Sequence, residues 1–164
     1  FNIDLYGGSA LTDNIRVPQN KNVDSIPNTI PVTYVAGRNL IFLSIAAGYA
    51  ESLDIDDIYI GVNSVDYSGY PDCRKEFIVS FEKMINKSTK KGLEGRSFRI
   101  KTPLIHLSKR EIILIGKKNS VDFSKTSSCY NPKNLKSCGL CDSCLLRKKG
   151  FEEAKIKDPL VYDV

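Results

Sequence analysis

The chain has 164 residues, 41% of them hydrophobic, and a formal net charge of +5. This length is enough for one hydrophobic core but short for two independent domains. The longest apolar run, residues 40–50, falls short of the roughly 20 apolar residues that a membrane-spanning helix needs, and no secretion signal is visible, so we expect a cytoplasmic protein without a membrane span.

The first third of the chain predicts a strand, a loop and a helix. Residues 1–6 have the composition of a strand, which Gly7 and Gly8 end. Residues 12–33 are rich in Asn and Pro, which indicates a long exposed loop, and we expect residues 12–32 to act as a lid over a ligand. Residues 38–53 show a helical pattern that is apolar on nearly every side, as in a helix buried against a sheet.

The alternation of strands and helices continues beyond this helix. Residues 57–62 read as a buried parallel strand, and residues 74–90 as a helix with Phe77, Phe81, Met84 and Ile85 on one apolar face. A short strand at residues 98–101 precedes a helix that begins at Ser108, where the S-x-x-E pattern of a capping box occurs. This order predicts an α/β fold with a mainly parallel sheet and right-handed crossovers.

Four of the five cysteines follow the pattern C-x8-C-x2-C-x2-C, namely Cys129, Cys138, Cys141 and Cys144. Four thiolates at this spacing can complete the tetrahedral shell that zinc prefers, which leaves no position for water and predicts a structural ion. Disulfides and an iron–sulfur cluster are the alternatives, and the tight clustering favours a metal. We expect residues 125–164 to form this zinc-binding segment, packed on an α/β domain of residues 1–124.

The remaining cysteine, Cys73, lies in the stretch DYSGYPDCRKEF at residues 66–77. It precedes Arg74 at a predicted helix N-terminus, and both features favour a nucleophilic thiolate. A small buried side chain that fills a loop is the plain alternative. The stretch follows a predicted parallel strand, where ligands of such sheets bind, and its tyrosines, tight turn and acids suit a flat, nitrogen-rich ring.

Charge is unevenly distributed along the chain. Residues 1–73 hold 3 basic and 9 acidic residues, whereas residues 74–164 hold 21 basic and 10 acidic residues. The basic half could attract phosphates or nucleic acid, although most of its lysines are expected on solvated helix faces. A non-catalytic zinc-ribbon module that binds RNA therefore stays open as an alternative.

Three stretches carry a more specific resemblance: GVNSVDYSGYPDCRKEF, IPNTIPVTYVAGRNLIFLSIAA and the four-cysteine segment that ends in CDSCLLRKKG. Together they resemble the 7-cyano-7-deazaguanine synthase (QueC) family of queuosine biosynthesis, through essentially the whole chain. The resemblance implies a Rossmann-like enzyme of the ATP pyrophosphatase type, a C–N ligase with a structural zinc. It implies that 7-carboxy-7-deazaguanine and ammonia become the nitrile, with ATP and Mg²⁺ activating first the carboxylate and then the intermediate amide. It also implies a homodimer that binds neither membrane nor nucleic acid.

The resemblance further implies roles for individual residues. The four clustered cysteines match the zinc ligands. Gly37, Arg38 and Asn39, together with Gly61, would meet the nucleotide, and Lys109 matches a phosphate-binding lysine, although it could be an ordinary surface residue in the first turn of its helix. Cys73 becomes a candidate for binding the substrate or holding an acyl intermediate. The other loop residues would hold the deazaguanine: Asp66, Tyr67, Ser68, Gly69, Tyr70, Pro71, Asp72 and Arg74.

Two departures from the family pattern bear on this interpretation. The S-G-G-x-D-S phosphate loop of the family has no match, because YGGSA at residues 6–10 lacks the Asp-Ser pair. Since the chain begins at Phe1 and its only methionine is Met84, we expect an N-terminal segment to be missing and the chain to be inactive on its own. The second departure, Ala36 where the family often has Pro, is mild.

A tRNA sulfur-transfer enzyme of the same fold is the closest enzymatic alternative, with Cys73 carrying the sulfur. Such enzymes generally need a second cysteine to resolve a persulfide. The other four cysteines of this chain are assigned to the metal, which disfavours this alternative.

Overall fold

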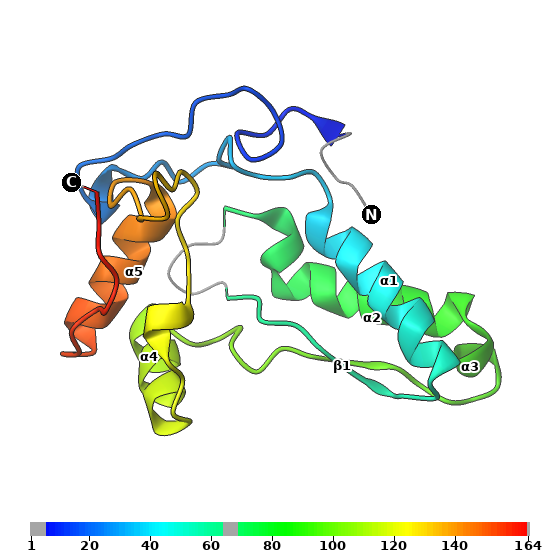
Figure 1. The fold of residues 1–164 in the computed structure, drawn as a ribbon. Coiled ribbons are helices and arrows are strands. Elements are labelled where there is room, and N and C mark those ends of the chain that lie inside the picture. Colours follow the sequence, from blue (N-terminus) through cyan, green and yellow to red (C-terminus); the bar gives the residue numbers. More distant parts are fainter. Residues whose placement is uncertain (1–5, 64–68, 164) are drawn as a thin grey trace. The chain divides into compact units, whose positions relative to one another are not determined.

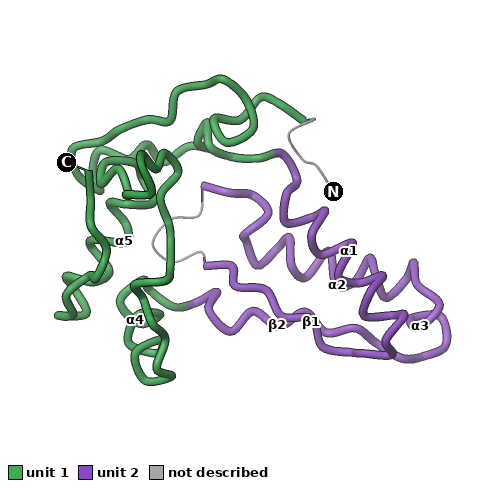
Figure 2. Tube along the Cα trace, viewed as in Figure 1, with its two compact units in different colours: residues 1–35, 107–164 green, residues 36–106 purple. Residues whose placement is uncertain are grey.

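The computed structural model describes residues 6–63 and 69–163. It contains two compact units: residues 36–106 form unit 2, whereas residues 1–35 and 107–164 together form unit 1 (Figure 1, Figure 2). No helix among the described residues is long and apolar enough to cross a membrane. The strand predicted at residues 1–6 lies almost wholly outside the described part of the chain, and the domain boundary predicted at residue 124 stays a prediction.

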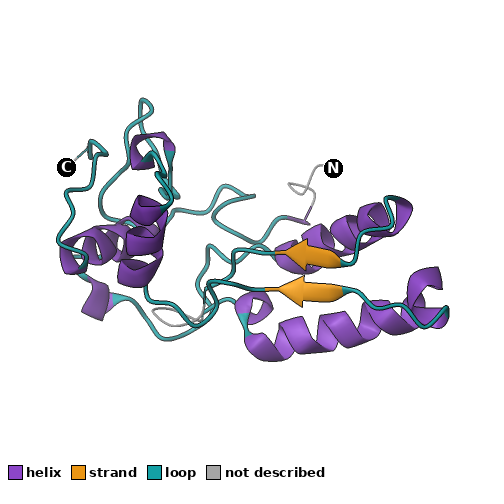
Figure 3. Cartoon of the chain, turned by 90° about the horizontal axis from the view of Figure 1, so that it is seen from below, coloured by secondary structure: helices purple, strands orange, loops and turns teal. Residues whose placement is uncertain are grey.

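The described residues of unit 2 form helices and a small parallel sheet (Figure 3). The elements, in chain order, are α1 (Arg38–Ser52), β1 (Asp57–Tyr59), the 3-10 turn η3 (Pro71–Cys73), α2 (Lys75–Ser88), α3 (Lys90–Leu93) and β2 (Arg99–Lys101). β1 pairs with β2 in parallel, and Ile58 stands opposite Ile100. The predicted parallel pairing is confirmed, although the strands are shorter than the apolar runs suggested.

The core of unit 2 lies between the sheet and its two long helices. Ile58 and Ile100 are buried in one cluster with side chains of α1 and α2. Because neighbouring side chains of a strand point to opposite faces, Tyr59 lies on the other face of the sheet, where it is 69% exposed. Within unit 2, α1 and α2 therefore cover one face of the sheet, and the Rossmann-like arrangement with flanking helices stays a proposal.

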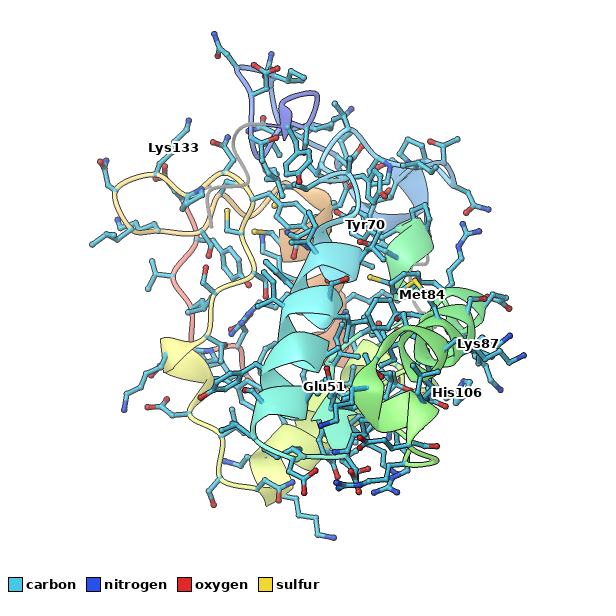
Figure 4. All side chains as sticks on the ribbon, turned by 90° about the vertical axis from the view of Figure 1, so that its right-hand side faces the viewer. Glu51, Tyr70, Met84, Lys87, His106 and Lys133 are labelled. Carbon is cyan, nitrogen blue, oxygen red and sulfur yellow. The ribbon has the colours of Figure 1, made fainter. Side chains whose placement is uncertain are left out.

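Each of the two long helices of unit 2 buries one face in the core and exposes the other. Leu43, Ala47 and Ala50 of α1 are buried at helical spacing, but the equally apolar Phe42, Ile45 and Tyr49 are exposed. The predicted packing of this helix against the sheet is confirmed, and the apolar side chains on its other side are exposed in unit 2 as described. In α2 the buried face is Ile78, Phe81 and Ile85, whereas Met84, labelled in Figure 4, is 47% exposed.

A buried lysine joins α3 to the chain that leads into β1. The side chain of Lys91 is only 3% exposed, and its Nζ lies 2.6 Å from Asp56 Oδ1 and donates to the Ile55 carbonyl at 2.8 Å. The ammonium also lies 5.1 Å from the ring centroid of Phe98, which is itself buried. A charge this deeply buried is tolerated because carboxylates and a carbonyl surround it.

Unit 1 packs two helices against each other. They are α4 (Lys109–Lys118) and α5 (Asp142–Glu153), which lie side by side in Figure 1. The capping box predicted at the start of α4 is confirmed, since Ser108 Oγ accepts from the Glu111 N–H at 3.2 Å and Glu111 Oε2 accepts from the Ser108 N–H at 2.7 Å. Gly150 permits the close approach, because a Cβ there would stand 2.7 Å from Lys109 Cβ.

Candidate functional site

The four clustered cysteines of unit 1 converge on one point. Their Sγ atoms all lie within 4.8 Å of one another. Sulfur atoms stand about 3.8 Å apart in a regular tetrahedron whose Zn–S bonds are about 2.3 Å long. Cys138, Cys141 and Cys144 are at most 3% exposed, and Cys129 is half-buried. This grouping could hold a metal ion, as the spacing in the sequence predicted.

The backbone around these cysteines is shaped to present their sulfurs. Gly139 has a φ of 74°, a left-handed conformation that favours glycine and turns the chain between Cys138 and Cys141. The Cys141 N–H donates to Cys138 Sγ at 3.4 Å, and the Cys138 N–H donates to Cys129 Sγ at 3.2 Å. Cys141 then caps α5, so Cys144 falls in the first helical turn, near the positive end of the helix dipole. These N–H groups stabilise negative charge on sulfur.

The electrostatics of the cluster favour a bound cation. A hydrogen bond with the Cys144 thiol lowers the pKa of Cys141 to about 5. The same hydrogen bond raises the pKa of Cys144, and burial raises the pKa of Cys129. One thiolate therefore forms readily, whereas several thiolates in so small a volume repel one another unless a cation compensates them.

The long loop of residues 12–33 is fixed to this cysteine cluster. Val17 is buried against the cysteines. The Asn20 N–H donates to the Leu140 carbonyl at 2.9 Å, and Asn20 Nδ2 donates to Asp142 Oδ1 at 2.6 Å. These contacts hold the middle of the loop to the chain that carries the cysteines, and they argue against a lid that moves as a whole.

In unit 2, the start of α1 and the candidate substrate loop form one hydrogen-bonded cluster. The Asn39 N–H donates to Asp72 Oδ2 at 2.9 Å. Asn39 Nδ2 lies 3.2 Å from both the Asp72 carbonyl and Cys73 Sγ. Asp72 is only 7% exposed. Hydrogen bonds thus join the Gly-Arg-Asn stretch to the Pro-Asp-Cys stretch, although Asn39 and Asp72 are 33 residues apart in the sequence.

This cluster changes the interpretation of the helix N-terminus. Gly37 is the N-cap residue of α1, with a φ of 61°. Because glycine has no side chain, it cannot accept a hydrogen bond from the free backbone N–H groups of the first helical turn. The buried carboxylate of Asp72 takes that place, because a negative charge is stabilised at the positive end of a helix. The Asn39 N–H, which the sequence assigned to a nucleotide, is engaged by Asp72 in this structure. Sequence reasoning missed this contact.

The surroundings of Cys73 contain one feature that favours a nucleophile and one that favours a packing residue. It ends the η3 turn next to the start of α2 and lies within hydrogen-bonding distance of Asn39 Nδ2, which favours a thiolate. It is also partly buried against the core of unit 2, as the plain packing alternative requires. Of its neighbours in the predicted loop, Asp66, Tyr67 and Ser68 lie outside the described residues.

The other predicted residues are distributed between the two units. Gly69, Tyr70, Pro71 and Arg74 lie in or next to η3, and Gly61 follows β1 by two residues. Lys109 is the first residue of α4 in unit 1. Lys133, labelled in Figure 4, is an exposed side chain in the segment between the first two clustered cysteines. Nothing in these positions assigns a role to an individual side chain.

Comparisons with known proteins agree with the motifs. A family model described as "Queuosine biosynthesis protein QueC" matches residues 2–155. The chain is 56% identical over 158 residues to a 7-cyano-7-deazaguanine synthase of Solidesulfovibrio magneticus, which covers 95% of this chain and 67% of that protein. It is also 56% identical to the synthases of Myxococcus xanthus, over 98% of this chain and 71% of that protein, and of Coxiella burnetii, over 99% and 71%.

Proposed function

Because the chain belongs to the QueC family of queuosine biosynthesis proteins, we propose that it works as a 7-cyano-7-deazaguanine synthase. The observation that carries this proposal is the identity of 56% to a protein of that name across 95% of the chain. Such identity extends through both compact units, so the loop with Cys73 and the four-cysteine cluster lie within the matched region. The proposed reaction converts 7-carboxy-7-deazaguanine and ammonia into the nitrile.

The proposed mechanism consumes ATP with Mg²⁺ as its counter-ion. One ATP adenylates the carboxylate and releases pyrophosphate, and ammonia then displaces AMP to give the amide. A second ATP adenylates the amide oxygen, again releasing pyrophosphate, and that oxygen leaves with the second AMP as the nitrogen loses its protons and the nitrile forms. Lysine and arginine side chains would neutralise the charge that develops on the phosphate oxygens, and Lys109 is our candidate. We also propose that the protein is a cytoplasmic homodimer.

Within this proposal the contacts of Asn39 hold Asp72 and Cys73, in the described part of the candidate substrate loop, against the start of α1. Two donors of Asn39 hold the backbone and carboxylate of Asp72 and a third contact reaches Cys73 Sγ. Because these residues are already held in place, little conformational entropy is lost there when a planar substrate binds. Cys73 then either contacts the substrate or attacks the activated carboxylate to form a thioester, with AMP as the leaving group.

We propose zinc as the ion of the cysteine cluster, with a structural role. Four sulfur ligands, with no other donor grouped with them among residues 6–63 and 69–163, suit a closed tetrahedral zinc site. When bound, zinc joins the Cys129 segment, the Cys138–Cys141 turn and α5 into one body. The convergence of these four cysteines also disfavours sulfur transfer, because it assigns to the metal the cysteines that such an enzyme would need to resolve a persulfide.

One assay tests the proposed reaction. The complete protein is supplied with ATP, Mg²⁺, ammonium and 7-carboxy-7-deazaguanine, and nitrile and AMP are measured together by chromatography. Both products are expected in step. Omission of ammonium is the matched control and should prevent nitrile formation. A well-folded, zinc-loaded protein that makes neither product under these conditions would rule out the proposed activity. Cys73→Ser in the same assay separates a nucleophile, whose loss abolishes turnover, from a packing residue.

A further inference from the structure

Residues 158–163 lie along the cysteine cluster of unit 1. The Asp163 N–H donates to the Ser137 carbonyl at 2.8 Å, and Tyr162 forms a parallel bridge with Ser137, the residue directly before Cys138. The side chain of Tyr162 packs against the buried cysteines. The segment 158–163 is therefore paired with the chain that enters the metal-binding turn, and its tyrosine shields part of the sulfur cluster.

An ion pair fastens this segment to α5. Arg147 Nε and Nη2 donate to the two carboxylate oxygens of Asp158, each at 2.9 Å, in a bidentate arrangement. The side chains are only 8% and 11% exposed. Asp158 Oδ2 also accepts from the Tyr162 hydroxyl at 2.5 Å. Arg147 follows Cys144 by about one turn of α5. The network therefore links α5, which carries Cys144, to Tyr162, which packs against the cysteines.

The same network reaches the other segments that carry cysteines. Arg147 Nη1 donates to Thr126 Oγ1 at 2.8 Å, three residues before Cys129. Lys148 Nζ donates at 3.0 Å to the carbonyl of Gly139, in the turn that presents the central cysteines, and lies 4.3 Å from the ring centroid of Tyr162. Every segment that supplies a sulfur is thus tied to Arg147, Lys148 or Tyr162.

We propose that Arg147, Asp158 and Tyr162 are positioning residues that retain the zinc ion of the cysteine cluster. A metal leaves such a site by losing its ligands one at a time, and each thiolate can move away only when its segment moves. The network opposes that motion in all three segments, and the Tyr162 ring restricts the approach of a competing ligand. This role depends on the metal site but not on the proposed synthase reaction.

Zinc release to a chromogenic chelator in excess tests this inference on the complete, zinc-loaded protein. Asp158→Asn keeps the shape of the side chain but removes the charge opposite Arg147, and Tyr162→Ala removes the ring. Loss of groups that orient metal ligands typically weakens retention about 10- to 100-fold, so we expect release at least about tenfold faster in both variants. Glu153→Gln, which breaks the exposed Lys149–Glu153 pair on the same helix, should release zinc at the wild-type rate.

The outcomes separate the possibilities. Wild-type release rates in Tyr162→Ala, with an unchanged far-ultraviolet circular dichroism spectrum, would overturn the inference. If Asp158→Asn fails to fold, Tyr162→Phe replaces it, because this change removes only the hydroxyl that donates to Asp158; release no faster than wild type would again overturn the inference. A wild-type protein that binds no zinc would refute both the metal site and the retention network. Nitrile formation is not part of this readout, so the synthase proposal stands or falls separately.

Discussion

Replacement of Asn39 by Ala tests whether the substrate loop is held by the start of α1. The variant loses the Nδ2 contacts to the Asp72 carbonyl and to Cys73 Sγ, both 3.2 Å long, but keeps the backbone N–H that donates to the Asp72 carboxylate. At about 0.5–1.5 kcal/mol for each hydrogen bond, the two contacts contribute about 1–3 kcal/mol to the free energy of unfolding. The loop should also lose its fixed geometry, so synthase turnover should fall together with stability.

Urea unfolding measures the first effect and the nitrile assay measures the second. Ser44→Ala is the matched control, because it removes one exposed side-chain hydrogen bond, from Ser44 Oγ to the Leu40 carbonyl, on the same helix. That control should retain turnover and lose less stability. An Asn39→Ala protein with wild-type stability and wild-type turnover would refute the reasoning, because it would show that the contacts to the loop contribute nothing to either.

Three further predictions concern the rest of the chain. Cys141→Ser should abolish stoichiometric zinc and leave an insoluble or unfolded protein, since a structural zinc contributes on the order of 10 kcal/mol to folding; metal analysis and solubility check this, and a folded, zinc-loaded variant would contradict it. Gly150→Ala should cost about 1–3 kcal/mol in urea unfolding, because the new Cβ would stand 2.7 Å from Lys109 Cβ. A hydrogen bond from Arg96 lowers the pKa of Asp54, and a hydrogen bond from Lys91 lowers the pKa of Asp56. These two carboxylates therefore stabilise the folded protein fully above the ordinary carboxyl pKa, and this stabilisation is lost as the pH falls through the lowered pKa values. Lys91→Met should flatten that acid limb of the stability profile, and an unchanged limb would exclude the lysine as its cause.

The sequence predicted what depends on local rules. The capping box at Ser108 and the cysteine cluster follow from spacings of a few residues, and a short range is enough to fix their geometry. The parallel pairing of β1 and β2 follows from the alternation of strands with helices. The capping box and the cysteine cluster could be read because residues close together in the sequence determine them. The pairing of β1 with β2 joins distant segments, and it was predicted from the general rule for alternating strands and helices.

The sequence did not predict what depends on distant contacts. The pairing of Asn39 with Asp72 joins segments 33 residues apart, and no periodicity signals it. The polar composition of residues 12–33 predicted an exposed loop. In the structure Val17 is buried against the cysteines, and Asn20 donates a hydrogen bond to Asp142. Met84 and Ile78 are equally apolar positions of α2, and only tertiary packing decides that Ile78 faces the core.

The order of the two units along the chain has a consequence for biosynthesis. Residues 36–106 are inserted between the two stretches that make unit 1, and Asn20 contacts Asp142, which follows it by 122 positions in the sequence. During translation, the whole of unit 2 is synthesised before any of the four clustered cysteines, and domains generally fold in the order in which they are made. Acquisition of zinc is therefore a late event, and the residues around Val17 must wait without their partners until the last cysteine appears.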